Sequence, residues 1–183
     1  MQLLTVVLLG ALVITFPRVI AAEPPEYTVC AVLARLPELD GKIIRVRGIA
    51  GARSRASYLR SSDCDLKLRT EELVWPNEIN LTGAGGALRK PEFEPDRPSL
   101  NRLYAVLRDQ TPRASPYSTS VVEVPVVIEG QVACRMIIAI NGNRQLVLGG
   151  LGPAGQFPAQ LVIKSVVFID SDKRVEFPQT PRR

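Results

Sequence analysis

The sequence predicts a mainly β domain with two helices, arranged as a five-stranded Greek-key barrel. The prediction rests on the strand-like alternation of the segment GKIIRVRG, on a strongly amphipathic helix pattern in the middle of the chain, and on the order of the segments. That order is a short helix, three strands, a helix, and then two or three strands.

The first strand is expected at residues 42–50, directly after an Asp-Gly turn. Successive side chains of a strand point to opposite faces, so Ile44 and Val46 are expected to face one way and Arg45 and Arg47 the other. This alternation is typical of a half-buried strand, and the second glycine of GKIIRVRG lets the strand bend.

Two segments carry helix signals. Residues 29–35 follow Thr28 as a candidate N-cap, and Pro37 is expected to end this short helix. Residues 99–108 form the second helix, because apolar side chains recur there at positions i, i+3, i+4 and i+7.

The other strands are expected between these helices and after the second one. Pro125 predicts that part of its strand lies at a sheet edge. An Asn-Gly hairpin turn is expected at residues 141–142. The expected segments are residues 58–60, a third strand made of 73–75 and 79–81, then 121–128, 131–140, 144–148 and 160–169.

The strand–strand–strand–helix–strand–strand order is that of an oligonucleotide/oligosaccharide-binding (OB) barrel. Several motifs extend the likeness over most of residues 28–169. They are Val29-Cys30, GKIIRVRG, Asp63-Cys64, FEPD (residues 93–96) and PAQLVIKSV (residues 158–166). With these motifs the chain resembles a group of secreted bacterial proteins of OB-like build. The resemblance implies a fold and brings no activity, cofactor or site residue.

The N-terminus reads as a secretory leader. Residues 3–16 are almost entirely apolar and too short for a comfortable bilayer span of about 20 residues. Cleavage after Ala21 or Ala22 would leave one domain, residues 23–170, followed by a flexible tail, residues 171–183. The protein is therefore expected to be secreted or periplasmic. No Lys or Arg precedes the apolar core, so an uncleaved anchor is the alternative, and the only expected route to a membrane.

Three cysteines follow the leader, and export permits oxidation. We expect Cys30 to pair with Cys64, because both lie near segment ends, while Cys134 lies in an apolar strand and is expected to stay free. The alternative is that all three thiols are free.

The chain contains no histidine, which removes the commonest general base, the Ser-His and Cys-His pairs and the usual zinc site. We therefore expect no enzyme activity, no metal and no cofactor. Asp63, Asp65, Glu92, Glu94 and Asp96 are interpreted as turn and cap residues rather than as calcium ligands. The glycine cluster at residues 83–86 is interpreted as a mobile loop, not a phosphate cradle.

OB barrels usually bind ligands on their second and third strands. That face would carry Arg53, Arg55, Tyr58, Arg60 and Trp75, with Lys67 and Arg69 beside them. The leading hypothesis is a non-enzymatic module that binds a small ligand or another protein. The alternatives are a polyanion or single-stranded nucleic-acid binder using this face, which export makes less expected, and a histidine-free hydrolase.

Overall fold

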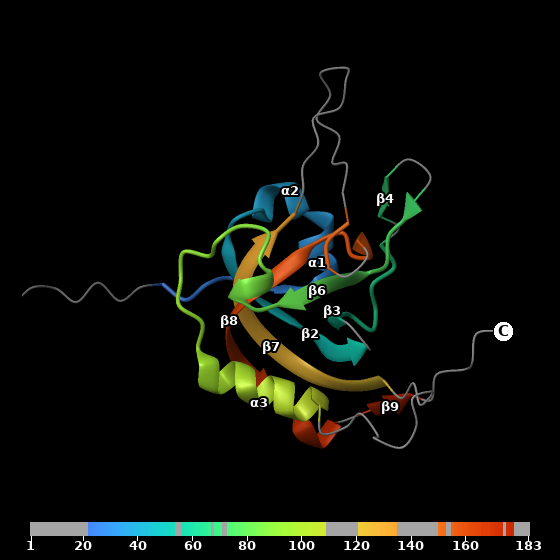
Figure 1. Ribbon diagram of the computed structural model, residues 1–183. Helices are drawn as coiled ribbons and strands as arrows, with labels where there is room; N and C mark the ends of the chain where they lie inside the picture. The colour runs from blue at the N-terminus through green and yellow to red at the C-terminus, as the bar shows by residue number, and fades with distance from the viewer. Residues whose placement is uncertain are drawn as a thin grey trace, which may run out of the picture.

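The computed structural model describes residues 22–53, 56–66, 68–70, 73–108, 121–134, 150–152, 155–173 and 175–177. This part of the chain is mainly β, as predicted, and it contains three α-helices instead of two (Figure 1). None of the helices in the described ranges has the length and apolarity that a membrane span requires. The helices are α1 (Val29–Ala34), α2 (Leu36–Leu39) and α3 (Arg97–Arg108).

The strands form one seven-stranded mixed sheet and one small two-stranded sheet. The large sheet has the order β1-β2-β3-β6-β8-β7-β9, and β2 also pairs with β7. Its strands are β1 (Glu26–Thr28), β2 (Ile43–Arg53), β3 (Ala56–Arg60), β6 (Glu78–Thr82), β7 (Val121–Ala133), β8 (Gln160–Ile169) and β9 (Val175–Phe177). The small sheet pairs β4 (Arg69–Thr70) with β5 (Leu73–Val74).

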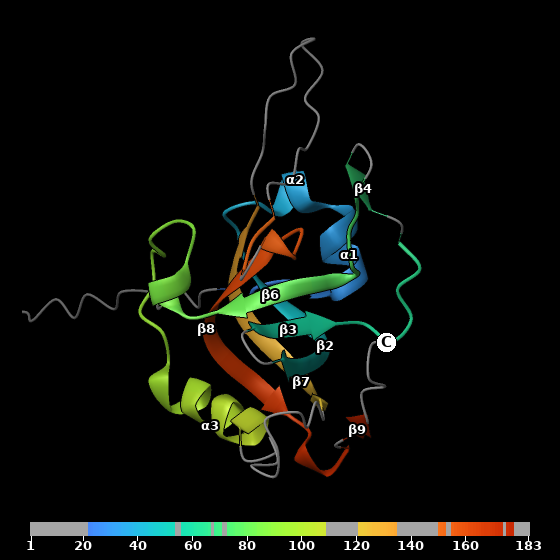
Figure 2. The same ribbon diagram turned by 45° about the vertical axis from the view of Figure 1, so that its right-hand side comes forward.

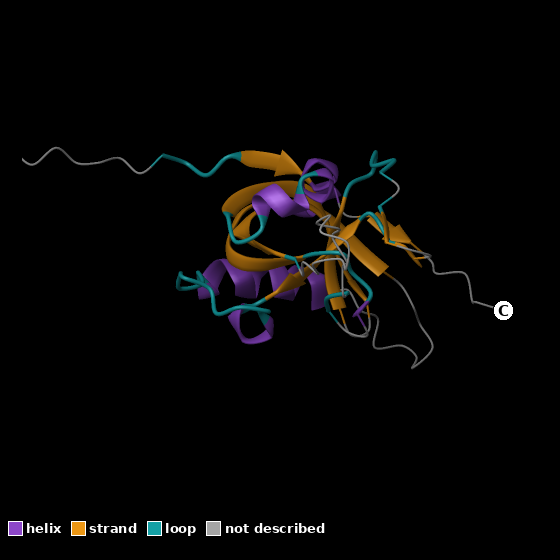
Figure 3. Ribbon diagram, turned by 90° about the horizontal axis from the view of Figure 1, so that it is seen from above, coloured by secondary structure: helices purple, strands orange, loops and turns teal. Residues whose placement is uncertain are grey.

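Strand β2 pairs with both β3 and β7. Following the pairings from β2 through β3, β6, β8 and β7 therefore leads back to β2. Four of these five pairings are antiparallel, and β6 with β8 is parallel. The α1–α2 pair and α3 lie at opposite ends of the strands (Figure 2), and seen from above the helices flank the strands on both sides (Figure 3). The main hydrophobic core contains residues from all three helices and from the five strands.

Most strand predictions are confirmed, and the third one is wrong in part. Residues 79–81 lie in β6, but Leu73 and Val74 turn back to pair with β4 instead of continuing into it. Pro76 explains the break, because a proline has no N–H to donate to a continuing ladder. The strands expected at 121–128 and from residue 131 are one continuous strand, β7.

The helix predictions are corrected at their ends. Thr28 caps α1 as predicted, accepting a hydrogen bond from Ala31 N at 3.2 Å. Pro37 does not end a helix; it lies within the first turn of α2, where its missing N–H would be unpaired anyway. Helix α3 begins at Arg97, and its buried Ser99 Oγ accepts from Val166 N on β8 at 3.0 Å.

Part of the expected tail has regular structure. Ser171–Lys173 forms a short 3-10 helix, η3, and β9 pairs antiparallel with the first residues of β7. On one edge of β7, Pro125 pairs with Ile49 of β2. On the other edge, the pairing with β8 reaches only Val126 and the pairing with β9 reaches only Glu123, so Pro125 belongs to neither of these two pairings. The leader core, the Asn141-Gly142 turn and the strand at 144–148 lie outside the described residues.

The disulfide prediction is confirmed. Cys30 on α1 and Cys64 after β3 are bonded, with their Cα atoms 5.3 Å apart. Cys134 is free and fully buried. Burial, aided by the nearby charge of Asp40, raises the pKa of the Cys134 thiol to about 12. A bonded pair is consistent with an oxidising compartment.

The second glycine of GKIIRVRG, Gly48, lies where β2 changes its neighbour from β1 to β3. A Cβ at this position would lie 2.8 Å from the backbone oxygen of Arg60 and 2.8 Å from a methyl group of Val29. The glycine is therefore required by the close approach of its neighbours.

Gly48→Ala is expected to lower the free energy of unfolding by about 1–3 kcal/mol, because backbone and core atoms must move to admit the methyl group. The measurement is urea unfolding followed by circular dichroism. Gly85→Ala is the matched control, since nothing lies within 4 Å of a Cβ there, and it should change the midpoint little. Equal losses in the two variants would contradict this account of Gly48.

The Cys30→Ser/Cys64→Ser double variant should lose about 3–4 kcal/mol of unfolding free energy, because its unfolded chain is less constrained. Dithiothreitol should lower the urea midpoint of the native protein and leave that of the double variant unchanged.

In the native state Cys134 should resist alkylation until the protein unfolds. Rapid labelling of Cys134 under native conditions would be inconsistent with its burial.

Candidate binding site

The predicted ligand-binding residues on β2 and β3 do come together on the outer face of the sheet. Leu59 points into the core, so its neighbours Tyr58 and Arg60 point outward. Tyr58 is nevertheless buried, because its ring packs against Phe157 and lies so close to Gly51 that any side chain there would overlap it.

A buried carboxylate of β7, Glu123, organises this face. It accepts a hydrogen bond from Tyr58 Oη at 2.8 Å and another from Arg60 Nε at 2.6 Å, and its second oxygen accepts from Arg60 Nη2. Glu123 is only 5% exposed. Burial and the bond to Glu123 raise the pKa of Tyr58, so the phenol stays protonated as a donor.

Arg53 is engaged in the same way. Its Nη2 lies 2.7 Å from Glu78 Oε1, and its guanidinium stands over the Tyr58 ring, 4.4 Å from the centroid. Arg53 and Arg60 are the two cations of the predicted binding face whose side chains the structure describes. Each of them therefore faces a carboxylate of this protein. The Tyr58 ring is covered rather than open for stacking.

The other predicted residues divide into two groups. Trp75 is 5% exposed and belongs to the hydrophobic core. Arg55 and Lys67 lie outside the described residues, and of Arg69 only the backbone in β4 is described. The structure thus brings together Arg53, Tyr58 and Arg60, whereas Trp75 packs in the hydrophobic core.

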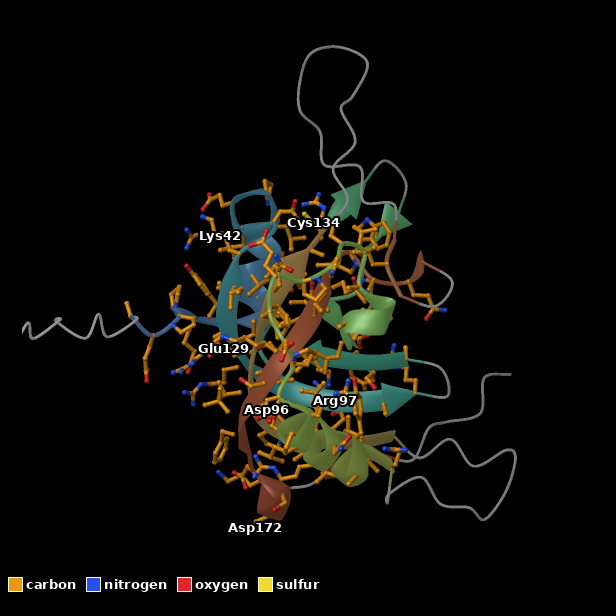
Figure 4. The ribbon with its side chains drawn as sticks, turned by 60° about the vertical axis from the view of Figure 1, so that its left-hand side comes forward. Lys42, Asp96, Arg97, Glu129, Cys134 and Asp172 are labelled. Carbon is orange, nitrogen blue, oxygen red and sulfur yellow. A yellow bond between two sulfur atoms is a disulfide. The ribbon has the colours of Figure 1, made fainter. Side chains whose placement is uncertain are left out.

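A second buried carboxylate, Glu129, lies further along β7 (Figure 4). Its oxygens meet Lys164 Nζ at 2.8 Å and Arg45 Nε at 3.3 Å, and Arg45 also bonds Glu23 of the N-terminal segment at 2.8 Å. Burial alone would raise the pKa of Glu129, but the bonds and charges of Lys164 and Arg45 outweigh it and lower that pKa.

An open pocket of about 670 Å³ lies beside this face. Its walls come from β3, β6, β8, the short 3-10 helix η1 (Ala84–Gly86) with its flanking residues, α3 and the segment 150–152. None of its described lining residues carries a formal charge. The lining includes Ser57, Asn80, Thr82, Tyr104, Leu151 and Gln160.

One buried side chain holds the glycine-rich wall of the pocket in place. Gln160 Oε1 accepts from Leu88 N, and its Nε2 donates to Gly86 O, both at 2.9 Å. The glycine cluster expected to be a mobile loop is therefore tied to β8. Gly152, which also lines the pocket, has a positive φ of 75° and lies close to Asn80 and Phe157.

Three polar side chains at the pocket have no protein partner among the described residues: the amide of Asn80 and the hydroxyls of Ser57 and Tyr104. The Asn80 residue is 4% exposed, and it lines the open pocket. Among the described residues, the fully buried side-chain atoms that lack a hydrogen-bond partner are Asn77 Oδ1 and Glu78 Oε2, and the Asn80 amide is not one of them.

The described residues contain no cluster of three or more His, Cys, Asp or Glu side chains that could hold a metal ion. The Cys134 thiol is buried and its pKa is raised, which is the opposite of what an activated nucleophile needs. Asp63 accepts from Ser61 Oγ within its own turn, in keeping with a turn role.

The comparisons with known proteins give no relative. No protein-family model, no curated protein and no solved structure matches this chain.

Sequence reasoning missed the residues that shape this region. Glu123 and Glu129 interrupt an apolar strand, VVEVPVVIEG, and a charge in such a strand is a sign that an opposite charge is buried with it. Asn80, Tyr104 and Gln160 gave no comparable signal, because their roles depend on which distant segments meet at the pocket.

Glu129 makes a specific prediction for acid stability. Because its pKa is lowered in the folded state, its ion pairs contribute fully above the ordinary carboxyl value of about 4.5 and are lost as the pH falls through the lowered pKa. Glu129→Gln should therefore be less stable at pH 7, by about 1–3 kcal/mol. It should also lose less stability than the native protein between about pH 5 and pH 2.

Urea unfolding at several pH values measures this difference. The control is Glu38→Gln, which alters an exposed pair with Arg35 and should follow the native pH profile. An acid-induced loss as steep in Glu129→Gln as in the native protein would refute the role given to Glu129.

Proposed function

We propose that this protein is an exported, non-enzymatic binding module built on an OB-like five-stranded barrel. The support for the fold is the set of pairings that returns from β7 to β2, the parallel β6–β8 pair and the position of α3 between β6 and β7. The disulfide and the leader support export. The proposal includes kinship with the secreted bacterial proteins that the motifs resemble.

The observation that carries the function is the open pocket of about 670 Å³, whose described lining residues carry no formal charge and include the polar side chains of Ser57, Asn80 and Tyr104. Ligand sites are concave and place a few polar groups on a fixed wall. Here the wall is fixed by the Gln160 bonds, and Asn80 supplies a polar group. The arginine face is a weaker candidate, because Arg53 and Arg60 already face Glu78 and Glu123.

Amide chemical-shift mapping by NMR tests the proposal. One arm uses uncharged hydrogen-bonding fragments, N-methylacetamide and glucose, and the other uses heparin and a single-stranded oligothymidine. We expect the uncharged fragments to shift the amides of Ser57, Thr82 and Leu151, which line the pocket. Heparin and oligothymidine should leave those amides unmoved.

Other outcomes have definite meanings. Shifts around Arg53 and Arg60 with heparin or oligothymidine, weakening steeply with salt, would replace the proposal with the polyanion-binding alternative. Hydrolysis of a probe during the titration would favour the histidine-free hydrolase. A pocket that responds to no uncharged fragment would overturn the proposed function.

A further inference from the structure

We propose that helix α3 and the end of β8 form a docking surface for a lipid bilayer that contains anionic phospholipids. The surface, called the α3 surface below, combines the exposed arginines of α3 with two exposed apolar side chains of β8: Arg97, Arg102, Arg108, Val167 and Phe168. The inference goes beyond the proposed function of the pocket and does not depend on it, because none of these five residues lines the pocket.

The amphipathic pattern of α3 turns its arginines to solvent. Leu100, Leu103 and Leu107 bury one side of the helix in the hydrophobic core. The other side is exposed and carries Arg97, Asn101, Arg102, Ala105 and Arg108. No acidic residue occurs within the helix, so the formal charges on its exposed side are all positive.

These three arginines have no carboxylate partner among the described residues. Arg108 Nε donates to the carbonyl oxygen of Tyr104 at 3.3 Å, and the side chains of Arg97 and Arg102 bond no described residue. The six other arginines whose side chains are described each form an ion pair with a carboxylate: Arg35, Arg45, Arg47, Arg53, Arg60 and Arg89. The charge of α3 is therefore available to an anion outside the protein.

Two neighbouring apolar side chains at the end of β8 are exposed as well. Val167 is 49% exposed and Phe168 is 52% exposed. Among the described residues, the only other large hydrophobic side chain with comparable exposure is Val74, on the small β4–β5 sheet. Adjacent exposed apolar side chains are typical of a surface that meets a partner or a membrane.

Hydrogen bonds place this end of β8 beside α3. Asp96 N, at the start of the helix, donates to Lys164 O at 2.7 Å. Two residues further along β8, Val166 N donates to Ser99 Oγ at 3.0 Å, so the strand and the helix run side by side in the same direction (Figure 2). The two exposed apolar residues that follow on β8 therefore come level with the helical turn that carries Arg102.

An anionic bilayer offers both of the contacts that this surface can make. Lipid phosphates accept the paired N–H donors of a guanidinium group. The acyl layer directly beneath the phosphates receives exposed apolar side chains. A nucleic acid supplies phosphates without an apolar layer. An acidic protein would need a patch of complementary shape, whereas lipid headgroups rearrange to meet separated cations.

Three aspartates close to the α3 surface in the chain moderate its charge. Asp170 already pairs with Lys173 at 3.3 Å. Asp96 directly precedes α3 and Asp172 lies in η3, and both are exposed (Figure 4). We therefore expect membrane binding to be moderate in strength and to weaken as salt screens the arginines.

Co-sedimentation of the full chain with lipid vesicles tests the proposal. One set of vesicles is phosphatidylcholine alone, and the other is phosphatidylcholine and phosphatidylglycerol in equal parts. The chain should bind the anionic vesicles more tightly, and high salt should remove the difference. Equal binding to both sets at low salt, as the expected apolar leader alone would give, would overturn the proposal.

The Arg97→Gln/Arg102→Gln/Arg108→Gln variant should bind the anionic vesicles about a hundredfold more weakly, because each cation close to an anionic surface contributes about fivefold. All three side chains are exposed, so we expect the variant to fold. Circular dichroism checks this. An unchanged affinity in the folded variant would contradict the role of α3.

The matched control is Arg35→Gln/Arg47→Gln/Arg89→Gln, which removes the same charge from exposed arginines that already face carboxylates. It should weaken vesicle binding by no more than about fivefold. Equal losses in the two triple variants would show that binding follows only the net charge of the protein, and would overturn the α3 surface.

Phe168→Trp reports on contact with the acyl layer. Its emission should shift to shorter wavelength on anionic vesicles, whereas Trp75 is already buried and should change little. Vesicle binding without this shift would contradict insertion of the β8 end. If vesicles do not bind while polyglutamate binds through the same three arginines, the partner is an acidic protein and the membrane proposal is wrong. The fragment titration of the pocket stands apart from these outcomes.

Discussion

The pairing of β2 on both of its edges is the constraint on which the rest of the structure depends. One edge pairs with β7 from Ile43 to Gly51, and the other pairs first with β1 and then with β3. This places β7 and β3, which are about 60 residues apart in the chain, on either side of one strand. Gly48 makes the change of neighbour possible because its close contacts leave no room for a side chain.

The same arrangement explains why the arginines of the predicted binding face are paired internally. Gly51 of β2 is opposite Tyr58 on one side and Glu123 on the other. The lack of a side chain at Gly51 lets the tyrosine cross it and reach the carboxylate. Arg60 then completes the pair, so a buried acid of β7 neutralises a cation of β3. Such a pair, once buried, is costly to break.

The polar groups left open lie elsewhere, at the pocket between β6, η1 and α3. The chain reaches this pocket from several distant segments, and each wall is held by a local contact. Gln160 fixes one wall, and the bridge between Leu151 and Phe157 fixes another. A concave pocket with fixed walls and a few polar side chains in its lining is the arrangement of a small-molecule site. This arrangement is the main reason for proposing a function there.

The amino-acid sequence by itself determined the mainly β class, the first strand, the position of α3 and the Cys30–Cys64 pair. These features follow from alternation, helical periodicity and the placement of cysteines, which are local properties of the chain. Only the tertiary structure decided that Arg53 and Arg60 face carboxylates and that Trp75 belongs to the core. Only it, too, brought Asn80, Tyr104 and Gln160 to one pocket. The physical reason is that charge pairing and burial depend on which strands become neighbours, and β2, β3 and β7 are brought together by pairings between residues far apart in the sequence.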